Sequence, residues 1–290
     1  MSSAGTAPSP APRIGHTGIT WPFTPAGARQ AMEELAPLGY QAVELFGFVL
    51  DAYPGGMEAV RADLARTGLT LAAAYCSAPL IDPSTHDADL ASMGRWAGMV
   101  RELGGEVVVV GASRRKRPVY EVQDYRYLSR TLEEVGRRCR AEGVLACFHP
   151  HTGTPVETRE EIDRVMSQVD PDLVFFAPDT GQIAKGGGDP LEVVRTYRER
   201  VRHVHLKDYV GGTTQLDAGG GGVDRTGWLD YVPLGQGVVD LASIARLLED
   251  AGYRGWWMVE LDGTPEAPVP PREAAAASKQ ELDRLLGVRR

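Results

Sequence analysis

The sequence contains few cysteines. There are three in 290 residues, Cys76, Cys139 and Cys147, and none of their spacings is the CxxC type of a zinc site. An odd number also argues against a complete disulfide framework, which small secreted proteins use to support a limited core. We therefore expect all three to be buried apolar side chains in a protein of the reducing cytoplasm.

Long hydrophobic runs and an excess of positive charge are lacking too. No apolar run approaches the roughly 20 residues that span a bilayer. Residues 1–12, MSSAGTAPSPAP, have neither the basic nor the apolar region of a signal peptide, and they predict a disordered lead-in. The formal net charge is −8 and the pI about 5.3. This charge argues against a nucleic acid or an anionic membrane as a partner, because both are negative.

What the sequence does contain is a regular alternation of short apolar runs and amphipathic stretches. Hydrophobic residues make up 43% of the chain and charged residues 24%, which is enough for a full core. Runs such as VVVVG and LVFFA are continuously apolar, as in parallel strands covered on both faces. An amphipathic helical stretch follows each strand, and the last of these lies within 272–286. The eight predicted strands span residues 13–20, 41–46, 69–75, 106–111, 144–149, 173–178, 202–206 and 256–260.

Eight strand–helix pairs in a chain of this length predict an α/β fold, a single (β/α)8 TIM barrel over residues 13–290. The open doubly wound alternative would need a Gly-rich phosphate loop after the first strand, but the chain reads GITWPFTP there. The Gly-rich loop 209–237 is predicted to be a lid, since long loops in compact domains are often functional. The run GGGDP is interpreted as a turn into a helix that Asp189 caps and Pro190 begins, not as a phosphate cradle.

Ionisable residues stand at the ends of four neighbouring predicted strands. In a barrel of this kind the active site lies at the C-terminal strand ends. Strands five to eight there read FHPHTGT, PDTGQ, HVHLKD and VELD, which include four of the six histidines. One ligand from each strand gives the predicted metal set His149, Asp179, His205 and Glu260. Two imidazoles and two carboxylates suit Mn²⁺, Co²⁺, Fe²⁺ or Zn²⁺ better than Ca²⁺ or Mg²⁺.

Each of these residues also has a structural interpretation. His203 and His205 fall on the same face of one strand, so one of them could simply line the core. Asp179, before Thr-Gly, could cap a helix, and Glu260 could pair with a nearby Lys or Arg. The coincidence of four ionisable strand ends, where a packed barrel would otherwise be apolar, favours the metal site.

Other polar residues are assigned outside this set. Glu44 and Tyr75 end the second and third predicted strands. They could bind substrate hydroxyls from across the barrel mouth, or serve in ion pairing and core packing. The remaining histidines, His16 and His86, are interpreted as structural.

The motifs FHPHTGT, DTGQIAKGGGDP, RHVHLKD, VPLGQGVVDL and GYRGWWMVE resemble the xylose isomerase-like barrel superfamily of sugar isomerases and epimerases. Within it they are most similar to the inosose dehydratases, and the resemblance covers residues 14–260. The superfamily implies one divalent metal held by Glu, Asp, His and Glu from strands five to eight. Asp179, His205 and Glu260 match three of these positions, and His149 stands in place of the first glutamate. Gln182 replaces the histidine of the usual DTGH and is expected to lie behind the ligands or to touch substrate.

The resemblance also implies a chemistry. A metal of this family, here expected to be Mn²⁺, polarises a carbonyl and stabilises the enediolate that forms when a base removes the neighbouring proton. With one glutamate replaced by a histidine, symmetric two-base epimerisation is less natural than elimination, which needs one base and one acid. We therefore expect a lyase acting on a keto-polyol or keto-sugar, with Glu260, His151 and Lys207 as candidate catalytic groups.

Two alternatives to a lyase fit the sequence, and one related class of enzyme does not. A metal-dependent isomerase or epimerase on the same site is the alternative, followed by a non-catalytic sugar-binding barrel. The abasic-site endonucleases of the superfamily need a three-metal cluster with further histidines on strands two to four and a D-x-H pair, which the chain lacks. The expected partner is a small keto-sugar or keto-inositol, with a homo-oligomer as a further option.

Overall fold

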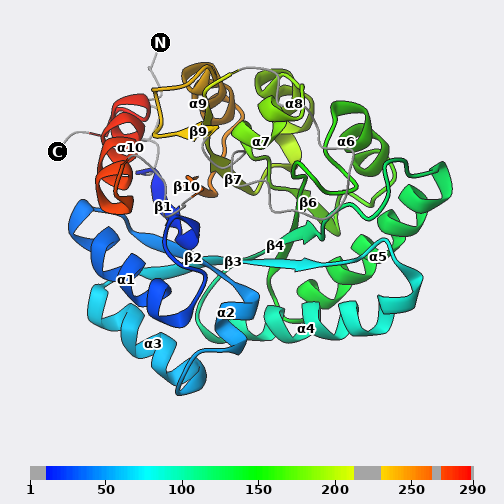
Figure 1. Cartoon of the computed structure of the whole chain (residues 1–290), viewed down its shortest axis with the longest axis horizontal. Coiled ribbons are helices and arrows are strands. Elements are labelled where there is room, and N and C mark those ends of the chain that lie inside the picture. Colours follow the sequence, from blue (N-terminus) through cyan, green and yellow to red (C-terminus); the bar gives the residue numbers. More distant parts are fainter. Residues whose placement is uncertain (1–10, 212–229, 263–268, 289–290) are drawn as a thin grey trace, which may run out of the picture.

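The computed structural model describes residues 11–211, 230–262 and 269–288, and its centre is one eight-stranded parallel sheet (Figure 1). The strand order is β6-β5-β4-β3-β2-β1-β10-β7. Parallel bridges between Phe176 and Val201 and between Asp179 and His205 join the two ends, so the sheet is a nearly closed barrel. The strands are β1 Arg13–Thr17, β2 Ala42–Phe46, β3 Thr70–Ala78, β4 Val107–Ala112, β5 Leu145–His149, β6 Val174–Phe176, β7 His203–Leu206 and β10 Trp256–Val259.

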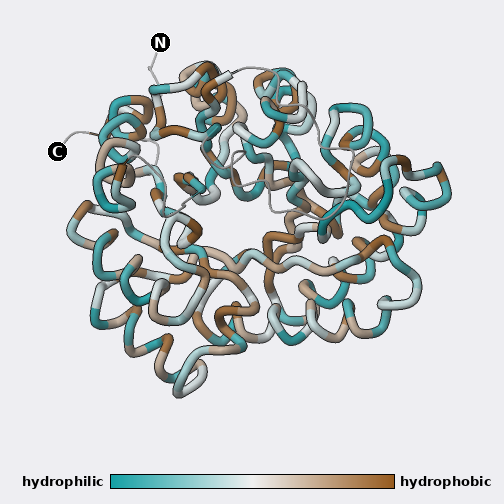
Figure 2. The backbone as a smooth tube through the Cα atoms, in the orientation of Figure 1, coloured by the Kyte–Doolittle hydropathy of each residue, from teal (hydrophilic) through white to brown (hydrophobic). Residues whose placement is uncertain are grey.

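Helices surround the barrel and pack their apolar faces on it. In Figure 2 these outer helices alternate between hydrophilic and hydrophobic stretches, as amphipathic helices on a sheet do. The helices are α1 Pro25–Leu35, α2 Gly47–Asp51, α3 Gly56–Thr67, α4 His86–Glu102, α5 Val122–Ala141, α6 Arg159–Met166, α7 Thr180–Lys185, α8 Pro190–Tyr197, α9 Leu241–Asp250 and α10 Pro271–Leu285. Short 3₁₀ turns occupy Gly18–Thr20, Ala36–Leu38, Pro83–Thr85 and Arg198–Arg200.

Helix starts follow the capping residues of the sequence. The Thr158 side chain accepts a hydrogen bond from the backbone N–H of Glu161, whose carboxylate returns to Thr158, and this capping box begins α6. Asp189 caps α8, with Pro190 at its first position. The interpretation of GGGDP as a turn and helix start is therefore confirmed.

The core has two layers, because successive side chains of each strand point to opposite faces. On β10, Trp256 and Met258 point into the barrel and Trp257 and Val259 point toward the helices. The same alternation turns Glu260 inward, at the C-terminal end of the barrel. The inner layer is made of Ala42, Ala72, Ala73, Val107, Val109, Cys147, Ala177, Trp256 and Met258.

The predicted (β/α)8 fold is confirmed, with different element bounds. The third strand runs three residues further than predicted, and the sixth is shorter. Helices α2 and α7, which are too short to show a period, were not predicted. All three cysteines are free and buried, as expected. Among the described residues no helix is long and apolar enough to cross a membrane.

The predicted lid and lead-in lie largely outside the described residues. The described ends of the long loop form a two-stranded antiparallel pair, β8 Asp208–Tyr209 with β9 Tyr231–Val232. Asp208 fixes this pair, since its buried carboxylate accepts backbone N–H groups from Tyr209, Gly235, Gly237 and Val239. A side chain at Gly237 would collide with that carboxylate.

A carboxylate between α1 and α3 provides a test of fold stability. Asp63 accepts hydrogen bonds from Arg29 (2.9 Å), Tyr53 (2.7 Å) and Arg66 (3.0 Å). Burial alone raises the pKa of Asp63, but these donors hold it below its ordinary value. Asp63→Asn is expected to lower the free energy of unfolding by about 1–2 kcal/mol at neutral pH. A matched change at an 86% exposed side chain, Glu199→Gln, should cost less than about 0.5 kcal/mol.

The pH dependence has a definite sign. Because the folded-state pKa of Asp63 is depressed, its contribution is complete above the unfolded-state value of about 3.9 and is lost as the pH falls through the folded value. Denaturant unfolding of wild type and Asp63→Asn should therefore converge below about pH 4. A gap that stays constant down to pH 2 would contradict this account.

Candidate active site

Three of the four predicted metal ligands come together at the C-terminal end of the barrel. The buried side chains of His149, Asp179 and His205 present possible ligand atoms that all lie within 4.8 Å of one another. The rings of His149 and His205 are 4.8 Å apart. The fourth predicted ligand, Glu260, lies beside them, with its Oε2 2.5 Å from Nδ1 of His205.

The donor atoms of this group fit a divalent metal ion. Nδ1 of His149 is buried without a hydrogen-bond partner, which is costly unless another ligand satisfies it. Oδ2 of Asp179 and Nδ1 of His205 are buried as well and lie 3.4 Å from Nζ of Lys207 and 2.5 Å from Oε2 of Glu260. Asp179 also caps α7, because its Oδ1 accepts the backbone N–H of Gln182 at 2.9 Å. The cap therefore uses one carboxylate oxygen and leaves the other available.

A second group of possible ligands shares one histidine with the first. It consists of Glu44, His203 and His205. Oε2 of Glu44 lies 2.7 Å from Nε2 of His203 and 3.0 Å from Nε2 of His205. These are hydrogen-bond distances. Glu44, for which the sequence allows substrate binding or ion pairing, lies here against two histidines of β7.

Lys207 lies at the centre of the acidic residues of the site. Its fully buried Nζ is 2.8 Å from Oε1 of Glu260, 3.0 Å from Oδ2 of Asp262 and 3.4 Å from Oδ2 of Asp179. The ammonium also lies 4.4 Å from the ring centre of Tyr231. Position 181 must be glycine, because a Cβ there would lie 2.6 Å from the Lys207 stem.

These contacts determine the charges of the carboxylates. Burial by itself raises the pKa of Glu260, but Lys207 and His205 hold it well below its ordinary value. Burial likewise opposes the charge of Lys207, yet Asp179, Asp262 and Glu260 raise the pKa of this ammonium well above the usual value. Burial raises the pKa of Asp179 to about 6 against the pull of Lys207. The site thus holds an ionised Glu260 paired to a charged Lys207.

The histidines of the site differ in their charge. Burial lowers the pKa of His205, but Glu44 and Glu260 on its two sides raise it well above the ordinary value. Burial, reinforced by the charge on His205, lowers the pKa of His149 well below that value. His149 is therefore a neutral imidazole with a lone pair to donate.

The remaining predicted site residues lie around this centre. The Tyr75 ring packs edge-on against His149 at 5.4 Å. The half-buried His151 lies 6.0 Å from the His149 ring, with Nδ1 2.7 Å from the carbonyl oxygen of Thr152. Oε1 of Gln182 accepts a hydrogen bond from the Thr152 hydroxyl at 2.5 Å. Gln182 thus fixes the loop after β5.

The two histidines interpreted as structural lie apart from this group. His16 is fully buried between the rings of Trp21 and Tyr40, and burial lowers its pKa to about 4. His86 begins α4, with Nε2 3.5 Å from Glu134. Both placements agree with the structural interpretation.

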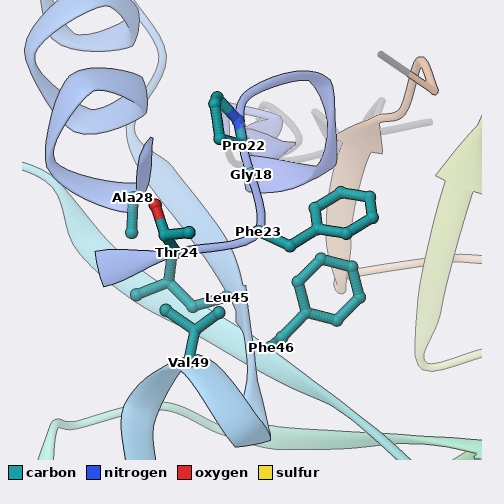
Figure 3. Close-up of a pocket in the computed structure, with 8 residues that line it drawn as sticks. All are labelled: Gly18, Pro22, Phe23, Thr24, Ala28, Leu45, Phe46 and Val49. Carbon is teal, nitrogen blue, oxygen red and sulfur yellow. The ribbon is translucent and has the colours of Figure 1, made fainter. Parts of the chain in front are cut away.

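An aromatic group on the β1–β3 side of the barrel mouth was not predicted. Phe46 stacks on Phe48 at 5.0 Å and contacts Phe23 and Tyr75 edge-on at 5.0 and 5.6 Å. Figure 3 shows the Phe23 and Phe46 rings together, turned away from Leu45 and the start of α1. This side of the mouth is therefore apolar, opposite the polar ends of β5, β6, β7 and β10.

Two polar residues of the site were also missed. Asp262, two residues beyond Glu260, could have been found from the period of two along a strand. Tyr231 could not, because it belongs to β9, which the sequence pattern placed inside a loop.

Comparison with known proteins places this geometry in a family. Residues 32–285 match the family described as xylose isomerase-like TIM barrel. An inosose dehydratase of Geobacillus kaustophilus (strain HTA426) is 32% identical over 280 residues, which cover 89% of this chain and 87% of that protein. An inosose dehydratase of Lacticaseibacillus casei is 28% identical over 277 residues, covering 89% and 90%.

A solved structure supports the fold independently. The IOLI protein with a bound zinc atom superposes with a TM-score of 0.74 over 95% of this chain and 98% of that one, at 15% identity. Identity that low supports the fold alone. The family match spans most of the chain, and the protein belongs to the xylose isomerase-like TIM barrel family.

Proposed function

We propose that the protein is a divalent-metal-dependent lyase that removes water, or another β-leaving group, from a keto-polyol or keto-sugar of the inosose type. Membership of the family and similarity to inosose dehydratases along the chain indicate a sugar-modifying enzyme, a dehydratase or an isomerase/epimerase. The observation that carries the finer proposal is the cluster of buried donor atoms on His149, Asp179 and His205 beside an ionised Glu260.

The chain's own residues supply a base and an acid. Glu260 is held as a carboxylate by Lys207, and it would accept the proton from the carbon next to the substrate carbonyl. Lys207, whose Nζ lies 2.8 Å from Oε1 of that carboxylate, would protonate the departing hydroxyl. His151 faces the carbonyl oxygen of Thr152 with Nδ1, so its Nε2 at the half-buried edge of the site could accept a proton.

A divalent ion held by His149, Asp179, His205 and Glu260 would polarise the carbonyl and stabilise the negative charge that develops on its oxygen. Mn²⁺ is our proposed ion, with Co²⁺, Fe²⁺ or Zn²⁺ fitting the same mixed N/O donors. Tyr75 and Gln182 border this space and are proposed to contact substrate.

Solvent exchange tests the reaction class directly. The enzyme loaded with Mn²⁺ is incubated in D₂O with keto-inositols, ketoses and 3-keto-glycosides, and the products are followed by NMR and ultraviolet absorbance. Deuterium incorporation next to the carbonyl together with new enone or diketone absorbance is the result expected of a lyase. Interconversion of two epimers, without absorbance change or loss of water or alcohol, would replace it with the isomerase/epimerase alternative.

Metal removal is expected to abolish turnover. After dialysis against a chelator, with metal loss verified by elemental analysis, activity should fall by about 100-fold or more, since polarisation of a carbonyl is worth several kcal/mol. Mn²⁺ or Co²⁺ should restore it, and the same dialysis with Mn²⁺ in excess serves as control. Full activity in the verified metal-free protein would contradict the single-metal mechanism.

A further inference from the structure

One buried glutamate inside the barrel contacts two histidines of a strand that is not its neighbour in the sheet. Glu44 lies on β2 and is 3% exposed, and both histidines lie on β7. Strands β1 and β10 separate β2 from β7 in the sheet, so the contact crosses the barrel mouth. A single oxygen, Oε2 of Glu44, lies 2.7 Å from Nε2 of His203 and 3.0 Å from Nε2 of His205.

We propose that Glu44 is a positioning residue that accepts the Nε2–H groups of His203 and His205 and thereby presents Nδ1 of His205 as the ligand nitrogen of the site. The inference rests on the metal site of the proposed function and assigns Glu44 a role other than substrate contact.

The tautomer of His205 follows from this contact. An imidazole that binds a metal ion is neutral and carries one N–H, and a carboxylate can only accept. In the metal-bound protein the hydrogen bond to Glu44 would therefore keep the proton on Nε2 and leave the Nδ1 lone pair for the ion. This buried Nδ1 lies 2.5 Å from Oε2 of Glu260, another predicted ligand.

The distances favour a supporting carboxylate over a ligand. The 2.7 Å between Nε2 of His203 and Oε2 of Glu44 matches a charge-assisted hydrogen bond. His203 then serves as the second donor that fixes the carboxylate, which explains why two histidines face the same side of β7.

The test measures metal affinity rather than activity. Apo-protein is titrated with Co²⁺ in competition with a chromophoric chelator. Glu44→Gln is expected to bind Co²⁺ about 10–100-fold more weakly than wild type, the usual effect of losing such a partner of a metal-bound histidine, and to shift the visible absorption of the bound Co²⁺.

Glu157→Gln is the matched control. Glu157 is also buried, at 5% exposure, and its carboxylate accepts the backbone N–H of Gly153 instead of a histidine. This variant should keep the affinity and spectrum of wild type. Equal affinity in Glu44→Gln and wild type would overturn the inference while leaving the metal site intact.

A measurement on the wild type covers the case in which Glu44→Gln does not fold. In the ¹⁵N NMR spectrum of the Zn²⁺-loaded protein, His205 should be protonated at Nε2 and bound through Nδ1. Binding through Nε2 would overturn the inference. If wild type binds neither Co²⁺ nor Zn²⁺, the proposed metal site is wrong and the inference fails with it. If wild type binds metal but Glu44→Gln binds it equally well, the inference alone is wrong.

Discussion

His205→Ala is expected to remove most of the bound metal, whereas His203→Ala is expected to retain it. His205 belongs to the group with His149 and Asp179, while His203 contacts Glu44 and His205. Loss of a direct ligand should weaken Co²⁺ binding by more than about 100-fold, since loss of a supporting partner alone costs 10–100-fold. Metal content per chain after gel filtration, together with Co²⁺ titration, measures both.

His203→Ala serves as the matched control for His205→Ala. Both remove one buried imidazole from the same strand, two residues apart, so the cavities they leave are alike. His203→Ala frees one side of the Glu44 carboxylate and should weaken Co²⁺ binding by less than about 10-fold. Equal loss in the two variants would mean that the ion is held by Glu44, His203 and His205 instead.

The fold could be predicted because its signals are local. Continuous apolar runs such as VVVVG specify strands buried on both faces, and the amphipathic stretches between them require crossovers to a parallel sheet. Bounds were less accurate where tertiary contacts decide them. The third strand continues past Tyr75 because β4 extends beside it, and Gly111 leaves the space that the Tyr75 ring needs.

The location of the candidate site was predictable for a similar reason. Strand ends converge at one face of a barrel, so ionisable residues at the ends of β5, β6, β7 and β10 had to meet. Which atoms contact one another depends on distances across the barrel, and sequence patterns along the chain do not predict these distances. Glu44 illustrates this limit, since its two histidine partners lie about 160 residues away in sequence.

The sequence indicated two alternative roles for Asp179, helix capping and metal binding, but not that one side chain could serve both. A turn or cap and a metal ligand were alternatives for one side chain. The structure places Oδ1 on the start of α7 and turns Oδ2 into the site, 3.4 Å from Nζ of Lys207, so the cap fixes the carboxylate that the site needs. A short helix directly after a strand is what makes both roles compatible.

Glu260→Gln is expected to lower kcat by about 1000-fold, which lies within the usual contribution of a general base. The amide keeps one oxygen that can act as a ligand but cannot accept a proton, so metal content should fall far less than activity. The exchange of the substrate α-proton with D₂O should be lost together with the elimination, because both begin with the same proton transfer.

The structure supplies the control and the contradicting result for this variant. Glu157→Gln makes the same chemical change at a buried carboxylate away from the ligand atoms and should leave kcat within about 2-fold. If Glu260→Gln bound Mn²⁺ more weakly but kept full exchange and turnover once saturated with Mn²⁺, Glu260 would be a ligand alone. The base would then have to be sought in His151, the nearby imidazole that burial keeps neutral by lowering its pKa. If instead exchange persisted but elimination stopped, Glu260 would act on the leaving group, and Lys207, 2.8 Å away, would be the residue through which its proton is supplied.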